Sequence, residues 1–129
     1  MKAHLILYVR DQTKATAFYS KVLMLQPSLE VPGMTEFRLS EGVKLGLMPE
    51  ESAGRLLGES VSFVDGSVRA RAELYLVVQD AADFHDRAVA AGAIEVSPLQ
   101  ERDWGHRVAY SKDPDAHILA FAEVGSAPE

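Results

Sequence analysis

The chain has 129 residues, the size of one ordinary domain that can bury a hydrophobic core without covalent staples. It contains no cysteine, which excludes disulfides, thiolate chemistry and cysteine-based zinc sites, and we expect a reducing, cytoplasmic location. The formal net charge is −6 with scattered basic residues, which argues against nucleic-acid binding and favours a cationic small ligand. The first apolar run is shorter than the roughly 20 residues that span a bilayer, so we expect no membrane partner.

An internal repeat organises the chain. The segment HLILYVRD at residues 4–11 reappears as ELYLVVQD at residues 73–80. Each copy is an apolar run that ends in an acid and leads into a helical pattern. A further match pairs residues 42–48 with residues 116–122. Such self-similarity predicts two half-domains with the same order of elements.

The first half is predicted to hold a strand, a helix and three more strands: strand 4–9, helix 13–25, and strands 29–31, 35–40 and 43–48. The opening strand is apolar without alternation, which is typical of a strand covered on both faces. We expect Pro27 to end the helix and Glu41-Gly42 to form a hairpin turn.

Residues 49–71 are polar and rich in glycine, and they are longer than most connections in compact domains. They are either a linker or a functional flap. The second half then repeats the plan, with a helix over 81–91 followed by Gly92, and strands 94–97, 107–111 and 118–123. We therefore expect one domain, 1–129, built from modules 2–48 and 72–124.

Alternation along the strands separates two faces. Leu5, Leu7 and Val9 are predicted to face the helices, as are Leu74, Leu76 and Val78. The opposite, helix-free face is predicted to carry His4, Ile6, Tyr8, Lys44, Gly46 and Met48 in the first half and Glu73, Tyr75, Val77, Ile118, Ala120 and Ala122 in the second. If two curved sheets oppose these faces, they enclose a cleft suited to small molecules. His4 and Glu73 would enter it from equivalent positions; the alternative is that each is an ordinary strand residue partly in water.

The chain resembles the vicinal oxygen chelate superfamily, which includes glyoxalase I, bleomycin resistance proteins, fosfomycin-inactivating enzymes and extradiol dioxygenases. The residues that carry the resemblance are His4, Asp11, Phe18-Tyr19, Trp104-Gly105 and Asp113-Pro114-Asp115. The resemblance implies an α+β fold of two βαβββ modules related by a pseudo-twofold axis, with curved mixed sheets that enclose a cleft, usually in a homodimer.

The resemblance also implies where a metal would bind. In the metal-using members the ligands come from the first and last strand of each module, and the matching positions here are His4, Gly46, Glu73 and Ala120. Only two of them can donate to a metal, whereas a divalent ion needs several nitrogen or oxygen ligands. We therefore expect no cofactor. The alternative is a loosely held divalent metal such as Zn, Ni, Mn or Fe on His4 and Glu73.

Three functions remain open. The first is metal-free binding of a small, aromatic, cationic molecule in the cleft, as in drug sequestration. The second is a lactoylglutathione-lyase-like lyase or isomerase in which His4 and Glu73 transfer protons. The third is a non-catalytic module that binds a metabolite. The candidate ligand-binding residues are Tyr8, Arg38, Lys44, Met48, Tyr75, Trp104 and Arg107.

Overall fold

The computed structural model describes residues 1–61 and 70–125, which belong to two compact units divided between residues 68 and 69. Each unit contains one four-stranded mixed sheet. The predicted α+β class with two βαβββ-like modules is confirmed. The cleft predicted between the two units stays a prediction.

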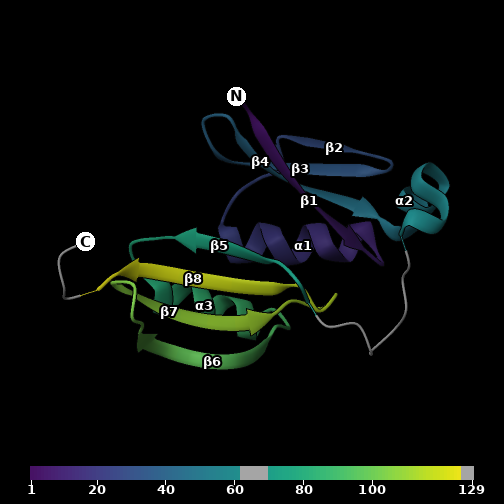
Figure 1. Ribbon diagram of the computed structural model, residues 1–129. Coiled ribbons are helices and arrows are strands. Elements are labelled where there is room, and N and C mark those ends of the chain that lie inside the picture. The colour runs from purple at the N-terminus through teal and green to yellow at the C-terminus, as the bar shows by residue number, and fades with distance from the viewer. Residues whose placement is uncertain (62–69, 126–129) are drawn as a thin grey trace. The chain divides into compact units, whose positions relative to one another are not determined.

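The first unit contains β1 (Ala3–Val9), α1 (Gln12–Leu23), β2 (Leu29–Val31), β3 (Met34–Ser40), β4 (Val43–Pro49), α2 (Glu50–Leu57) and a 3-10 turn, Gly58–Ser60 (Figure 1). Its strands lie in the order β1-β4-β3-β2. The repeat's first and last strands, β1 and β4, are parallel neighbours, while the other neighbours are antiparallel.

The second unit contains β5 (Glu73–Val77), α3 (Ala81–Ala90), β6 (Ile94–Glu101), β7 (His106–Lys112) and β8 (Ile118–Val124) (Figure 1). Its strand order is β5-β8-β7-β6, with β5 parallel to β8. In the two registers Ile6 lies beside Gly46 and Tyr75 lies beside Ala120. The two predicted sequence matches therefore occupy equivalent places in the two sheets.

The acid that closes each copy of the repeat begins a helix. The Asp11 side chain accepts a hydrogen bond from the Lys14 amide at 3.0 Å, and the Asp80 side chain accepts one from the Asp83 amide at 3.1 Å. Both acids thus satisfy one of the amides that a helix start leaves without a partner. The prediction that α1 extends to residue 25 was wrong, because Met24 adopts a left-handed φ of 57° that ends the helix before Pro27 is reached.

Hydrogen bonds identify the helix-covered face of the first sheet. The hydroxyl of Thr35 on β3 lies 2.9 Å from the hydroxyl of Thr16 on α1. The register places the buried side chains of β1, β3 and β4 on this same face: Leu7, Val9, Phe37, Leu45 and Leu47. The parity predicted for β1 is therefore observed. However, β1 is an edge strand, and its Leu5 is 38% exposed, so the expected cover on both faces does not extend along the whole strand.

The second sheet shows the same division. The ring centroids of Phe84 on α3 and Phe121 on β8 lie 5.5 Å apart, which identifies the helix-covered face of the second sheet. Because side chains alternate along a strand, Ala120 and Ala122 lie on the helix-free face, as predicted. Tyr75, paired with Ala120 in the register, lies there too.

The predicted linker or flap, residues 49–71, contains a helix, α2, that was not predicted from the sequence. Helix α2 follows β4 directly and has Glu50 and Glu51 in its first turn. Arg55 forms an ion pair with Glu51 at 2.9 Å, one helical turn away. Residues 62–69 lie outside the described part of the chain, so the choice between linker and flap stays open. None of the helices in the described part is long and apolar enough to cross a bilayer.

Candidate functional site

A hydrogen-bonded aromatic group lies on the helix-free face of the second unit. The phenol oxygen of Tyr75 on β5 accepts a hydrogen bond from Trp104 Nε1 at 2.9 Å. The same oxygen lies 2.6 Å from Nδ1 of His106 at the start of β7, and the Tyr75 and His106 rings are stacked with centroids 5.9 Å apart. One phenol thus joins three rings, which we call the aromatic platform: Tyr75, Trp104 and His106.

The floor beneath the platform is apolar. Val108, Ala120 and Ala122 are fully buried, and the partly buried rings of Tyr75 and Tyr110 pack against them. Small residues on β8 therefore leave room for large rings above them. Burial raises the pKa of Tyr110 above its usual value, and the nearby charge of Glu73 raises it further.

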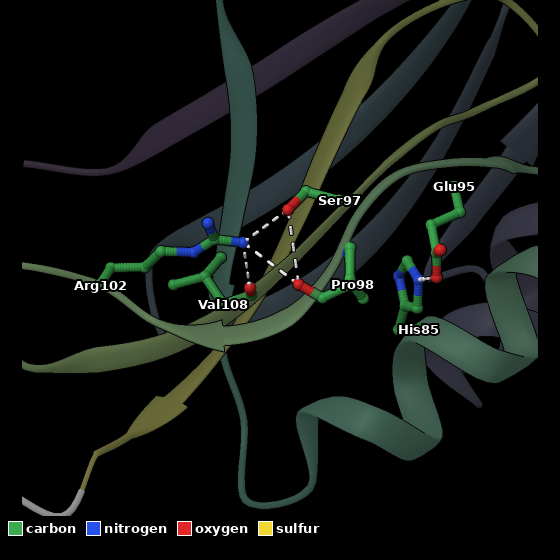
Figure 2. Close-up of polar contacts among 6 residues, drawn as sticks. All are labelled: His85, Glu95, Ser97, Pro98, Arg102 and Val108. Atoms are coloured by element: carbon green, nitrogen blue, oxygen red, sulfur yellow. Dashed lines mark hydrogen bonds and ion pairs between the residues drawn. The ribbon is translucent and has the colours of Figure 1, made fainter.

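Arg102 holds the turn that presents Trp104. Its Nη2 donates to the hydroxyl of Ser97 and to the carbonyls of Pro98 and Val108, at 2.9, 3.2 and 2.8 Å (Figure 2). Its backbone amide donates to the carbonyl of His106 at 2.9 Å. Trp104 thus lies in a turn that is fixed from both the side chain and the main chain of Arg102.

The helix-free face of the first unit carries a charged cluster. Oε1 of Glu36 on β3 lies 3.3 Å from Lys44 Nζ, and its Oε2 lies 3.7 Å from His4 Nδ1. We call His4, Glu36 and Lys44 the first-sheet cluster. Arg38 shares this face, because it lies opposite Lys44 in the register. Tyr8 and Met48 are half-buried register partners further along the same face.

The position predicted to correspond to a metal ligand on β4 is closed by neighbouring side chains. A Cβ on Gly46 would lie 2.5 Å from Ile6 Cδ1 and 3.2 Å from Met34 Sδ. The corresponding position on β8, Ala120, bears a methyl group that cannot donate to a metal. The four positions therefore offer only the donors of His4 and Glu73, and they do not fit a resident divalent ion.

Arg107 does not lie on the helix-free face of the second sheet, where it was predicted to bind a ligand with Tyr75. It pairs with Glu123 at 3.0 Å, and Glu123 also accepts a hydrogen bond from the Ala81 amide at the start of α3. Arg107 therefore lies on the helix-covered side of its sheet. Glu73 and Tyr75, by contrast, are both on the helix-free face, where Glu73 is exposed at the start of β5.

His106 and Glu36 were not predicted from the sequence to be site residues. His106 follows the Trp104-Gly105 pair, and its alternation with Val108 and Tyr110 was the available signal. Glu36 alternates with the buried Thr35 and Phe37, which placed it on the helix-free face. What the sequence lacked was the register that brings each of them to its partner.

The remaining histidines have structural partners. His85 Nε2 lies 2.7 Å from Glu95 Oε2 (Figure 2), and His117 Nδ1 lies 2.9 Å from the buried carboxylate of Asp113. Within residues 1–61 and 70–125, no group of three or more histidine and acidic side chains gathers closely enough to hold a metal ion.

Comparison with known proteins agrees with this architecture. The model of the Glyoxalase/Bleomycin resistance protein/Dioxygenase superfamily matches residues 3–121. The chain belongs to this superfamily. YraH of Bacillus subtilis (strain 168) is 27% identical to this superfamily member over 124 residues, which is 92% of this chain and 94% of YraH.

Solved structures show the same fold. A glyoxalase-related enzyme from Fulvimarina pelagi has a TM-score of 0.80 at 24% identity, covering 95% of this chain and 87% of that one. Protein ATC0852 from Agrobacterium tumefaciens has a TM-score of 0.73 at 26% identity, covering 98% of both chains. Both likenesses support the two-module fold described above.

Proposed function

We propose that this superfamily member binds a small aromatic molecule on the aromatic platform, without a resident metal ion. The observation that carries the proposal is the exposure of the Trp104 ring. Trp104 is 55% exposed, although its Nε1 donates a hydrogen bond to Tyr75. An exposed ring that is already fixed loses little conformational entropy when a flat ligand stacks on it.

The proposal that the ligand is cationic rests on charge. The chain carries a formal charge of −6, and the exposed carboxylate of Glu73 lies on the same face as the platform. Aromatic faces attract cations, most strongly when the cation is partly desolvated. A planar ring bearing a positive charge would use both features, as a sequestered drug would.

The absence of suitable ligands at positions 46 and 120 supports binding without a metal. The second candidate, a lyase or isomerase that uses His4 and Glu73 around a loosely held divalent ion, is favoured by one observation: Glu36 lies near His4 Nδ1, where an acceptor can orient an imidazole. Unfolding of metal-stripped protein with added Zn, Ni, Mn or Fe tests it. A stabilisation of about 2.7 kcal/mol at one hundred times the dissociation constant would support the lyase.

Trp104 is the only tryptophan, so its fluorescence reports directly on the platform. We would titrate the protein with quinolinium and acridinium cations and with neutral rings of the same size, and follow Trp104 emission. Binding that changes this emission, with the cations bound more tightly than the neutral rings, is expected. A metabolite-binding module would instead respond to neutral or anionic rings.

Variants locate the binding. Replacing Trp104 with Ala should weaken binding, measured by calorimetry, about fivefold, because ring stacking contributes about 1 kcal/mol. Tyr75→Phe should weaken it less, by releasing the indole. Tyr110→Phe is the matched control, since its ring packs on the same floor without a hydrogen bond to Trp104. Equal affinities in the wild type and Trp104→Ala would disprove the proposed platform.

A further inference from the structure

The first-sheet cluster contains its own cation. Glu36 uses one oxygen for the Lys44 ammonium and the other for the His4 imidazole, and its side chain is only 14% exposed. Three strands bring the groups together, because His4 lies beside Lys44 in the parallel pair β1–β4 and Glu36 lies beside Gly46 in the pair β3–β4. The carboxylate that could bind a metal together with His4 is thus already paired with an ammonium group.

The charges on this face leave a positive surplus. Lys44 and Arg38 are cationic and lie opposite each other in the register, whereas Glu36, which pairs with Lys44, is the single acid in the first-sheet cluster. An ammonium has three donors, and Glu36 accepts from one of them. The Arg38 side chain is exposed and makes no hydrogen bond or ion pair with other side chains in the described part of the chain. Donors for an added anion therefore remain on both side chains.

We propose that Lys44 is a built-in cation that replaces a metal ion beside His4, and that Lys44 and Arg38 bind the anionic oxygen of a small molecule. The chemical class is a carboxylate or a phosphate, both of which take charge-assisted hydrogen bonds from lysine and arginine. Glu36 positions the ammonium and prevents it from rotating away. This binding site lies on the first unit and does not depend on the aromatic platform.

Titration with two different anions distinguishes a carboxylate ligand from a phosphate ligand. The protein at low ionic strength is titrated with benzoate and, separately, with inorganic phosphate, while the NMR signals of the lysine Cε methylene groups are followed. A shift of the Lys44 signal with benzoate alone assigns a carboxylate ligand, and a shift with phosphate alone assigns a phosphate ligand. If neither anion shifts it, the proposal is overturned.

A matched pair of variants tests whether Lys44 itself binds the anion. Lys44→Met should weaken binding of the active anion about tenfold, as loss of a charge-assisted hydrogen bond predicts. Lys14→Met makes the same change of net charge on the exposed side of α1 and should leave affinity within about twofold. Lys44→Arg should retain most of the affinity. Equal losses of affinity in Lys44→Met and Lys14→Met would show that only the net charge matters, and would overturn the proposed site.

A metal titration tests the replacement directly. Lys44→His removes the ammonium and leaves three potential donors, His4, Glu36 and the new imidazole. Zinc should then raise the melting temperature of Lys44→His by about 4 °C or more, while the wild type stays unchanged. Stabilisation of the wild type by zinc, or none in a folded Lys44→His, would contradict the proposal. Because Trp104 emission is not used here, failure of the aromatic platform would leave these results unaffected.

Discussion

Ile6 fills the space that a side chain on Gly46 would require: a Cβ on Gly46 would lie 2.5 Å from Ile6 Cδ1. The two residues are register partners on adjacent parallel strands, β1 and β4. The glycine at this position is therefore matched to the isoleucine beside it. A side chain at this position, where the resemblance implies a metal ligand, would require the end of the Ile6 side chain to move.

Gly46→Ala should lower the free energy of unfolding by about 1 kcal/mol, because the added methyl group forces Ile6 to move. Ile6→Val removes the Cδ1 atom that would be struck. In the Ile6→Val background, the same Gly46→Ala change should be neutral or stabilising, since alanine is less flexible than glycine when unfolded. Urea denaturation of the four proteins measures the coupling. Additive effects would show that Ile6 does not limit position 46.

Arg102→Lys should loosen the turn that carries Trp104. Lysine lacks the planar fork that reaches Ser97, Pro98 and Val108 together, so we expect a loss of about 1–3 kcal/mol in stability. Trp104 emission should also shift to longer wavelength as the indole becomes more hydrated. Arg107→Lys is the control, because the partly exposed side chain of Arg107 makes a single ion pair, with Glu123. If both variants lose the same stability, Arg102 is not the anchor of the turn.

Asp113 should be among the most sensitive positions in the second unit. Its buried carboxylate accepts from the amides of Asp115 and His117, at 2.9 and 2.8 Å, and lies 2.9 Å from His117 Nδ1. Asp113→Ala leaves these donors without their acceptor and should cost about 2–4 kcal/mol of stability. Asp113→Asn retains one acceptor and should cost less. The exposed neighbour Lys112 provides a control, and Lys112→Ala should change stability by less than about 0.5 kcal/mol.

The raised pKa of Tyr110 predicts how the free energy of unfolding changes at high pH. Burial, followed by the charge of Glu73, raises the pKa of this phenol above 10.0, so the folded chain holds the proton more tightly than the unfolded chain does. The resulting stability is fully present below about pH 10 and is lost as pH rises through the folded pKa. Urea denaturation between pH 9 and pH 11 should show a steeper fall for the wild type than for Tyr110→Phe. Parallel pH profiles would rule out this contribution.

The repeat and the strand faces could be predicted from the sequence because both depend on local periodicity. Side chains alternate every residue along a strand, so the division between Leu7 and Tyr8, or between Phe121 and Ala120, is determined before any strand has found its partner. The two aspartates that follow the repeated strands likewise act within one helical turn. Helix α2 was missed because Gly54 and the surrounding polar residues obscured its pattern.

The partners across the sheets could not be predicted, because register and strand order depend on contacts between distant segments. Tyr75 and His106 are 31 residues apart, and the sequence does not state that β8 lies beside β5. Arg107 was expected among the ligand-binding residues, but pairing of β7 with β8 places it beside Glu123 on the helix side. Glu36 likewise lies near His4 because strands β1 and β3 both pair with β4. Local alternation thus assigned each residue to a face, while the tertiary structure decided which residues meet there, because only folding brings separate strands into one register.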